Sequence, residues 1–195
     1  MPRPLTLGRT ALLALVPLVL PLAGCIKQPG VVKAPSPMDA AVVGVLDPQD
    51  GGPVAGLPDR VTERVSRALT ARDLTPAPVP TAQLAEAFSS RRVTKQRVAW
   101  LADGNNDAPL VVLVEAEALY YSQIEGRNRW TVNVTATVAD PDAPESGLTS
   151  SFEVPVILQF VHEKEPRALE EAAPIIERQV GHLLDQYLGA LPAGG

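Results

Sequence analysis

The stretch WTVNVTATV, residues 130–138, alternates strictly between apolar and polar side chains. Successive side chains of a strand point to opposite faces, so this pattern predicts a β-strand with one buried and one solvent-facing side. Residues 151–161 also have an apolar side chain at every second position, from Phe152 to Phe160, and residues 110–121 open with the apolar run LVVLV. The sequence therefore predicts three long strands in succession.

Turn residues separate these three strands. Glu125-Gly126 lies between the first two and is typical of a tight hairpin, and the segment from Asp140 to Gly147 forms the second connection. Pro155 has no amide proton to donate, so the third strand is expected at an edge of the sheet or with a bulge there. The three strands are thus expected to form an antiparallel meander.

The segments around the meander complete the pattern. A buried strand is expected at 40–46, a helix at 57–74 with Pro58 in its first turn, and a short edge strand at 74–79. Thr81 is a plausible N-cap for a helix that reaches Phe88, with a second helical stretch at 91–101. A last helix is expected at 166–188, kinked or restarted at Pro174 and ended by Gly189.

This order, β-α-β-α-β-β-β-α, predicts an α+β fold. We expect a two-layer domain in which a mostly antiparallel sheet of about four to five strands carries its helices on one face. The first strand would pair with one of the long strands through the helical crossover.

The chain's charge limits the classes of partner. Residues 1–24 contain two of the 17 Lys and Arg residues and none of the 22 Asp and Glu, so the remainder has a net charge of −7. A net acidic chain argues against a nucleic-acid binder.

The amino terminus has the layout of a secretory signal. Arg3 and Arg9 precede a short apolar run at 11–22, and Leu22-Ala23-Gly24-Cys25 follows. This resembles the lipobox of bacterial lipoproteins, which implies cleavage before Cys25 and acylation of that residue.

The lipobox resemblance implies how the chain is divided. We expect a signal peptide at 1–24, lipidated Cys25 with a flexible tether at 25–38, one periplasmic α+β domain at 39–189 and a disordered tail at 190–195. Three acyl chains suffice for stable anchoring. Ile26-Lys27 lacks the Asp typical of inner-membrane retention, which favours the outer membrane, with the domain facing the periplasm.

The element order behind a lipobox resembles the group formed by CsgG, LpoB and the amino-terminal part of TolB. The strand AVVGVLD at 41–47 and the segment APLVVLV at 108–114 carry this likeness. It implies an accessory or assembly factor that binds an envelope protein. The meander and last helix are also similar to the lipopolysaccharide-assembly lipoprotein LptE, which leaves a glycolipid-binding or lipopolysaccharide-transport role as an alternative.

The sequence contains few histidines and cysteines, residue types that enzymes often use for catalysis. After Cys25 the chain offers His162 and His182 and no further cysteine, and no zinc or phosphate-binding motif is present. We therefore expect no cofactor, no metal and no enzymatic activity. The carboxylates Glu115 and Glu117, on one strand face, are the alternative for an enzyme, although exposed charges are the simpler interpretation.

Two local features suggest a partner surface. One is a cationic segment of four residues: Arg91, Arg92, Lys95 and Arg97. It could bind an acidic partner, but a solvated helix face is the simpler interpretation. The other is the aromatic group Tyr120, Tyr121 and Trp130 around the first hairpin, with arginines nearby, which suits a protein interface or a local hydrophobic cluster.

Overall fold

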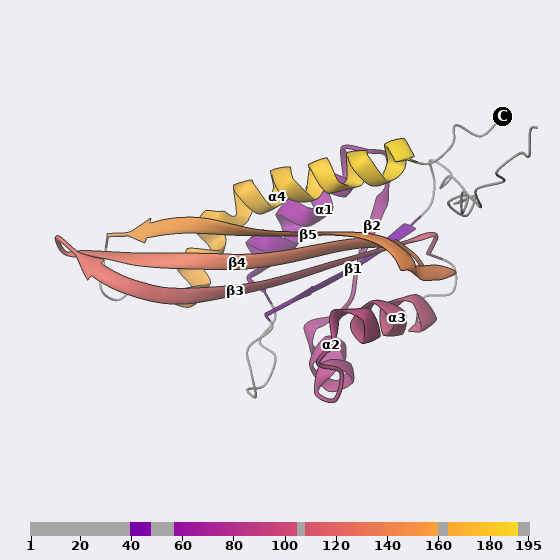
Figure 1. The fold of residues 1–195 in the computed structure, drawn as a ribbon, viewed down its shortest axis with the longest axis horizontal. Coiled ribbons are helices and arrows are strands. Elements are labelled where there is room, and N and C mark those ends of the chain that lie inside the picture. The colour runs from indigo at the N-terminus through magenta and orange to yellow at the C-terminus, as the bar shows by residue number, and fades with distance from the viewer. Residues whose placement is uncertain (1–39, 48–56, 105–107, 160–163, 191–195) are drawn as a thin grey trace, which may run out of the picture. The chain divides into compact units, whose positions relative to one another are not determined.

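The structure is a computed structural model that describes residues 40–47, 57–104, 108–159 and 164–190. Cys25, the lipobox, the tether and residues 191–195 of the expected tail lie outside these residues, whereas residue 190 belongs to the last helix. The elements run β1 (Ala40–Leu46), α1 (Asp59–Thr70), β2 (Thr75–Pro78), α2 (Thr81–Phe88), α3 (Thr94–Gly104), β3 (Leu110–Ile124), β4 (Arg127–Asp140), β5 (Ala143–Leu158) and α4 (Glu165–Ala190). Figure 1 shows this arrangement.

The strands form one five-stranded sheet in the order β2-β1-β3-β4-β5. The long pairings, β3 with β4 and β4 with β5, are antiparallel, whereas β1 pairs in parallel with both β2 and β3. The predicted crossover is confirmed, because β1 lies against β3. Both edge predictions are confirmed too, since β2 and β5 end the sheet.

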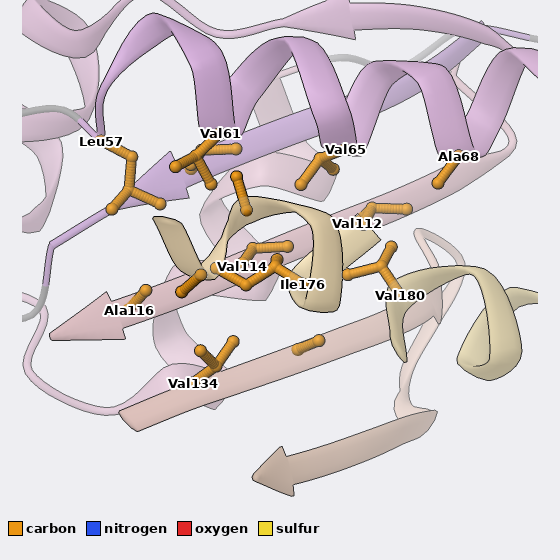
Figure 2. Packing of buried hydrophobic residues seen from close by; sticks show 14 of the residues in the cluster. Leu57, Val61, Val65, Ala68, Val112, Val114, Ala116, Val134, Ile176 and Val180 are labelled. Atoms are coloured by element: carbon orange, nitrogen blue, oxygen red, sulfur yellow. The ribbon is translucent and has the colours of Figure 1, made fainter. Parts of the chain in front are cut away.

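One face of the sheet carries the larger core. Helices α1 and α4 pack side by side there on alternate residues of β1, β3 and β4, as Figure 2 shows for Val61, Ile176 and Val134. The alternation seen in residues 130–138 is the cause, because Val132, Val134, Ala136 and Val138 are all buried on this face. The two-layer α+β domain is therefore confirmed.

The second face is covered only in part. Helices α2 and α3 pack there against Val42, Leu46, Val111 and Leu113 in a separate buried cluster. The expectation that all helices share one face was thus wrong for these two. The physical reason is visible in β1 and the start of β3, whose continuous apolar runs leave hydrophobic side chains on both faces.

The boundaries also differ in detail from the sequence prediction. Pro58 and Pro80 occupy the N-cap positions of α1 and α2, so Thr81 is the first helical residue and not the cap. Pro174 lies inside α4, which continues through Gly189 to Ala190. β5 begins at Ala143, because the β4–β5 turn is much shorter than expected.

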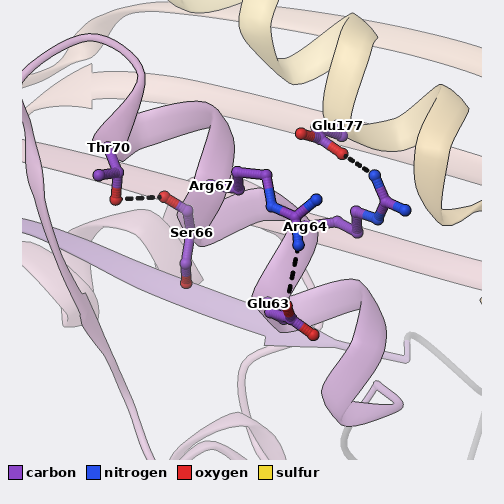
Figure 3. A network of polar contacts seen from close by, with 6 residues as sticks. All are labelled: Glu63, Arg64, Ser66, Arg67, Thr70 and Glu177. Carbon is purple, nitrogen blue, oxygen red and sulfur yellow. Dashed lines mark hydrogen bonds and ion pairs between the residues drawn. The ribbon is translucent and has the colours of Figure 1, made fainter.

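Ion pairs join the two helices of the first face. Arg64 Nη1 donates to Glu177 Oε2 at 2.8 Å and so links α1 to α4, whereas Arg67 pairs within α1 with Glu63 (Figure 3). None of the helices in the described part of the chain is long and apolar enough to cross a membrane.

Candidate functional site

The first hairpin turns through two residues with positive φ. Glu125 has a φ of 51° and Gly126 a φ of 76°. Two such residues in succession are typical of the type I′ turn, whose twist matches that of the flanking strands. The Glu125-Gly126 signal therefore correctly placed the end of β3 and the start of β4.

The end of the sheet beside this turn exposes a group of large apolar side chains. Their exposed fractions are 45% for Leu119, 54% for Tyr120, 74% for Tyr121, 48% for Ile124 and 59% for Ile157. Arg127 and Arg129 are exposed beside them. Tyr120 and the half-buried Trp130 lie on the face that α1 and α4 cover, whereas the register places the other six residues on the opposite face. We call these eight residues, on both faces of this end of the sheet, the hairpin-end surface.

Ring contacts fix the aromatic side chains of this surface. Tyr120 lies opposite Trp130 in the β3–β4 register, and their rings meet edge to face at 5.5 Å with an interplanar angle of 68°. The ladder shifts register after Tyr120, and the Arg129 guanidinium lies 5.6 Å from the ring centroid of Tyr121. Each of the two tyrosines thus contacts one neighbouring side chain on the sheet.

The cationic segment divides into surface and interior residues. Arg92 and Lys95 are exposed, and Arg91 is half-buried and donates to the carbonyl oxygen of Ala87. Arg97 is only 8% exposed, which differs from the expectation of a solvent-facing cation. This segment therefore does not form one continuous basic face.

Arg97 holds α3 on the sheet. Its guanidinium forms an ion pair with Glu115 on β3, donates through Nε to the carbonyl oxygen of Arg91 at 2.7 Å and lies 5.5 Å from the ring centroid of Phe88. Thr94 Oγ1 donates to the same carboxylate at 2.7 Å. The interpretation of Glu115 as an exposed charge was wrong, because its carboxylate is buried and neutralised by Arg97.

The structure does not bring the two predicted partner regions together. The segment at 91–97 covers the part of the sheet near Leu113 and Glu115, whereas the hairpin-end surface occupies the far end of β3. A single ligand of small size cannot touch both.

Sequence reasoning missed Trp100. Two shallow hollows of about 390 and 410 Å³ share Arg91 and Trp100 on the outer side of α2 and α3. The Trp100 ring packs edge to face on Phe88 at 5.3 Å. In the sequence, Trp100 appears only as an aromatic residue in a cationic helix, and packing in the core would explain such a residue equally well.

Helix α4 carries further titratable groups. His182 is exposed on this helix, as expected, whereas His162 lies outside the described residues. A hydrogen bond from Arg72 lowers the pKa of Asp185, and burial raises the pKa of Tyr187 to about 12. Within the described ranges, no three His, Cys, Asp or Glu side chains group as metal ligands would.

No family model and no curated protein matches the chain. Several solved structures are similar in part. Among them are the PelC dodecamer from Paraburkholderia phytofirmans (16% identity, 77% of this chain and 91% of that chain, TM-score 0.43), the hypothetical protein CT253 from Chlamydia trachomatis (16%, 78% and 99%, 0.46) and lipoprotein GNA1162 from Neisseria meningitidis (13%, 77% and 99%, 0.38). At these identities and TM-scores, no functional argument rests on them.

Proposed function

We propose that this chain is a lipid-anchored outer-membrane lipoprotein whose periplasmic domain binds an envelope protein as a non-enzymatic accessory or assembly factor. The lipobox at 22–25 supports the anchor, and the hairpin-end surface supports the binding role.

The hairpin-end surface is the observation that carries the proposal. Tyr121 and Ile157 are the most exposed large apolar side chains of the described residues. The surface contains five of the seven that are exposed, and four of these five share the face that points away from α1 and α4. Single exposed apolar residues are normal on protein surfaces, whereas a group of them on one surface marks an interaction site. Aromatic and arginine side chains are also the types that dominate protein interfaces.

The contacts of the two tyrosines fit a protein partner. Tyr120 packs on Trp130 and Tyr121 lies beside Arg129, and these contacts lower the entropy cost of ordering the two tyrosines on binding. The arginines add donors for carboxylates or backbone carbonyls at the rim.

Site-specific photo-crosslinking in the living cell tests the binding role. A photoreactive amino acid at Tyr121 should capture one envelope protein, identified by mass spectrometry after mild detergent extraction. The matched control is Val93, which is 57% exposed but lies outside the hairpin-end surface. Capture at both positions alike, or at neither, would contradict the proposed surface.

A variant that should lose binding provides a second test of the surface. Tyr121→Asp places a charge in the apolar surface and should reduce recovery of the captured protein about tenfold or more, whereas Val93→Asp should leave it unchanged. Circular dichroism of both variants controls for folding.

Membrane fractionation tests the anchor separately. Cys25→Ala should release the protein from the membrane fraction, because the acyl chains would have no attachment point. Full retention of this variant with the membranes would refute lipidation at Cys25.

A further inference from the structure

Among the described residues, no strand pairs with the outer edge of β5. β5 has 16 residues and pairs only with β4, and no other described residue adds a strand beyond it. An edge strand presents a row of free N–H and C=O groups, which natural proteins usually shorten, cover or interrupt.

Two observations show which residues of β5 direct their backbone groups outward. Pro155 has no N–H, so its nitrogen belongs on the outer side of the ladder, opposite Thr131. The hydroxyls of Thr135 and Ser151, and those of Thr137 and Thr149, lie 3.1 Å apart, as suits the closer spacing of non-hydrogen-bonded pairs. The backbone groups of residues 149, 151, 153 and 155 therefore point away from β4.

The usable part of this edge has two natural ends. At Pro155 the outward donor is missing. At the other end, the regular pairing with β4 stops at Leu148, where the register shifts between Val138 and Asp140, so Gly147 is the first residue beyond it. The midpoint of the stretch between these ends is Ser151, and Thr149, Ser151 and Glu153 are all exposed along it.

We propose that β5 pairs antiparallel with the β5 of a second copy about a two-fold axis at Ser151. In this register Ser151 faces its own counterpart, Thr149 faces Glu153 and Gly147 faces Pro155. Glu153 thus meets a hydroxyl donor on the other copy. A shift that centres the axis on Thr149 or on Glu153 would set carboxylates opposite each other, which is unfavourable.

The other edge of the sheet explains why such pairing would stop at two copies. The N–H of Val79 donates to the carbonyl oxygen of Val43 on β1 and therefore points into the sheet. The backbone groups of the alternate residues Pro76 and Pro78 point outward from β2, and proline has no N–H to donate there. A head-to-tail chain of sheets would need that edge. With it blocked, the symmetric β5–β5 pairing is closed and gives a dimer. This inference depends on neither Cys25 nor the hairpin-end surface.

Disulfide trapping tests the register. In full-length Cys25→Ala protein, purified in mild detergent, a single introduced cysteine is the only thiol. Ser151→Cys should form a disulfide-linked dimer on oxidation with copper phenanthroline, because two facing residues in such a pair lie within disulfide reach. Thr149→Cys is the matched control: its two copies would be about 14 Å apart along the strands, so its yield should be about tenfold lower.

A charge pair tests the interface without cross-linking. Ser151→Lys places two ammonium groups face to face and should convert the dimer to a monomer, whereas Thr149→Lys places each ammonium opposite Glu153 and should preserve it. Mass is measured by analytical ultracentrifugation at about 1–100 μM, and circular dichroism confirms that both variants fold.

The expected result is a dimer for the parent and Thr149→Lys proteins and a monomer for Ser151→Lys. A monomeric parent throughout this range, equal trapping at positions 149 and 151, or equal effects of the two lysines would overturn the proposal. A partner protein bound to this edge in place of a second copy would appear as the first of these outcomes.

Discussion

Replacing Arg97 with Met should be among the most damaging single changes in this domain. The side chains of Arg97 and Glu115 are 10% and 7% exposed, so removing the guanidinium leaves a carboxylate out of water with only Thr94 to donate to it. Breaking a buried ion pair by removing one partner costs about 3–5 kcal/mol. The carbonyl oxygen of Arg91 also loses its donor.

The double variant Arg97→Met/Glu115→Leu separates the ion pair from its surroundings. Glu115→Leu alone should cost about as much as Arg97→Met, because it leaves the guanidinium buried without its counter-ion. Removing both charges should cost only about 1–2 kcal/mol, because neither charge then remains buried alone. The coupling in this double-mutant cycle should therefore reach several kcal/mol.

Urea unfolding followed by circular dichroism measures all three variants. Arg67→Met is the matched control, because Arg67 pairs with Glu63 where both side chains are more than half exposed (51% and 67%). An exposed pair contributes at most about 1 kcal/mol, so this change should have little effect. If Arg97→Met costs less than about 1 kcal/mol, or if the single changes add without coupling, the buried-pair reasoning is refuted.

Three further changes probe other parts of the domain. Folding lowers the pKa of Asp185, chiefly through its hydrogen bond from Arg72. The ionised carboxylate therefore adds stability above about pH 4, and this stability is lost as the pH falls through the pKa of Asp185 in the folded protein. In Asp185→Asn, the loss of stability at acid pH should be correspondingly smaller. Burial raises the pKa of Tyr187 to about 12, so the unfolded chain loses the phenol proton at a lower pH than the folded protein does. Stability should therefore fall as the pH rises from about 10 to 12. Thermal unfolding of Tyr187→Phe should not show this loss of stability. Gly126→Ala forces a side chain into a backbone with φ of 76° and should lower unfolding stability by about 1 kcal/mol, measured in urea; an unchanged midpoint would argue against the type I′ turn.

The meander was predictable because its signals are local. The alternation at 130–138 depends only on the two faces of one strand, and the Glu125-Gly126 turn is set by two adjacent residues. Pro155 likewise restricted β5 to an edge or a bulge without any knowledge of the other strands, and the edge is what the sheet shows. Each of these inferences needed fewer than about 15 residues of context.

The second helical layer was not predictable in the same way. The apolar run of β1 predicts a buried strand but does not say which helices cover which face. The burial of Arg97 depends on Glu115, a residue on another element, so a cluster of four cations looked like a solvated face. Sequence spacing reveals periodicity within an element, whereas a buried ion pair is a property of two elements in contact.

The parallel pairing of β1 with β3 has a consequence for the order of folding. Val43 and Val112 are register partners although they are about 70 residues apart in the sequence, so closing this pair carries a large loop entropy. The β3–β4–β5 meander needs only short loops and can form earlier. Until then the run AAVVGVL of β1 can pair only with the four-residue edge strand β2 and remains an aggregation-prone segment. The slow step in producing this protein is therefore expected to be the capture of its first strand by an already formed sheet.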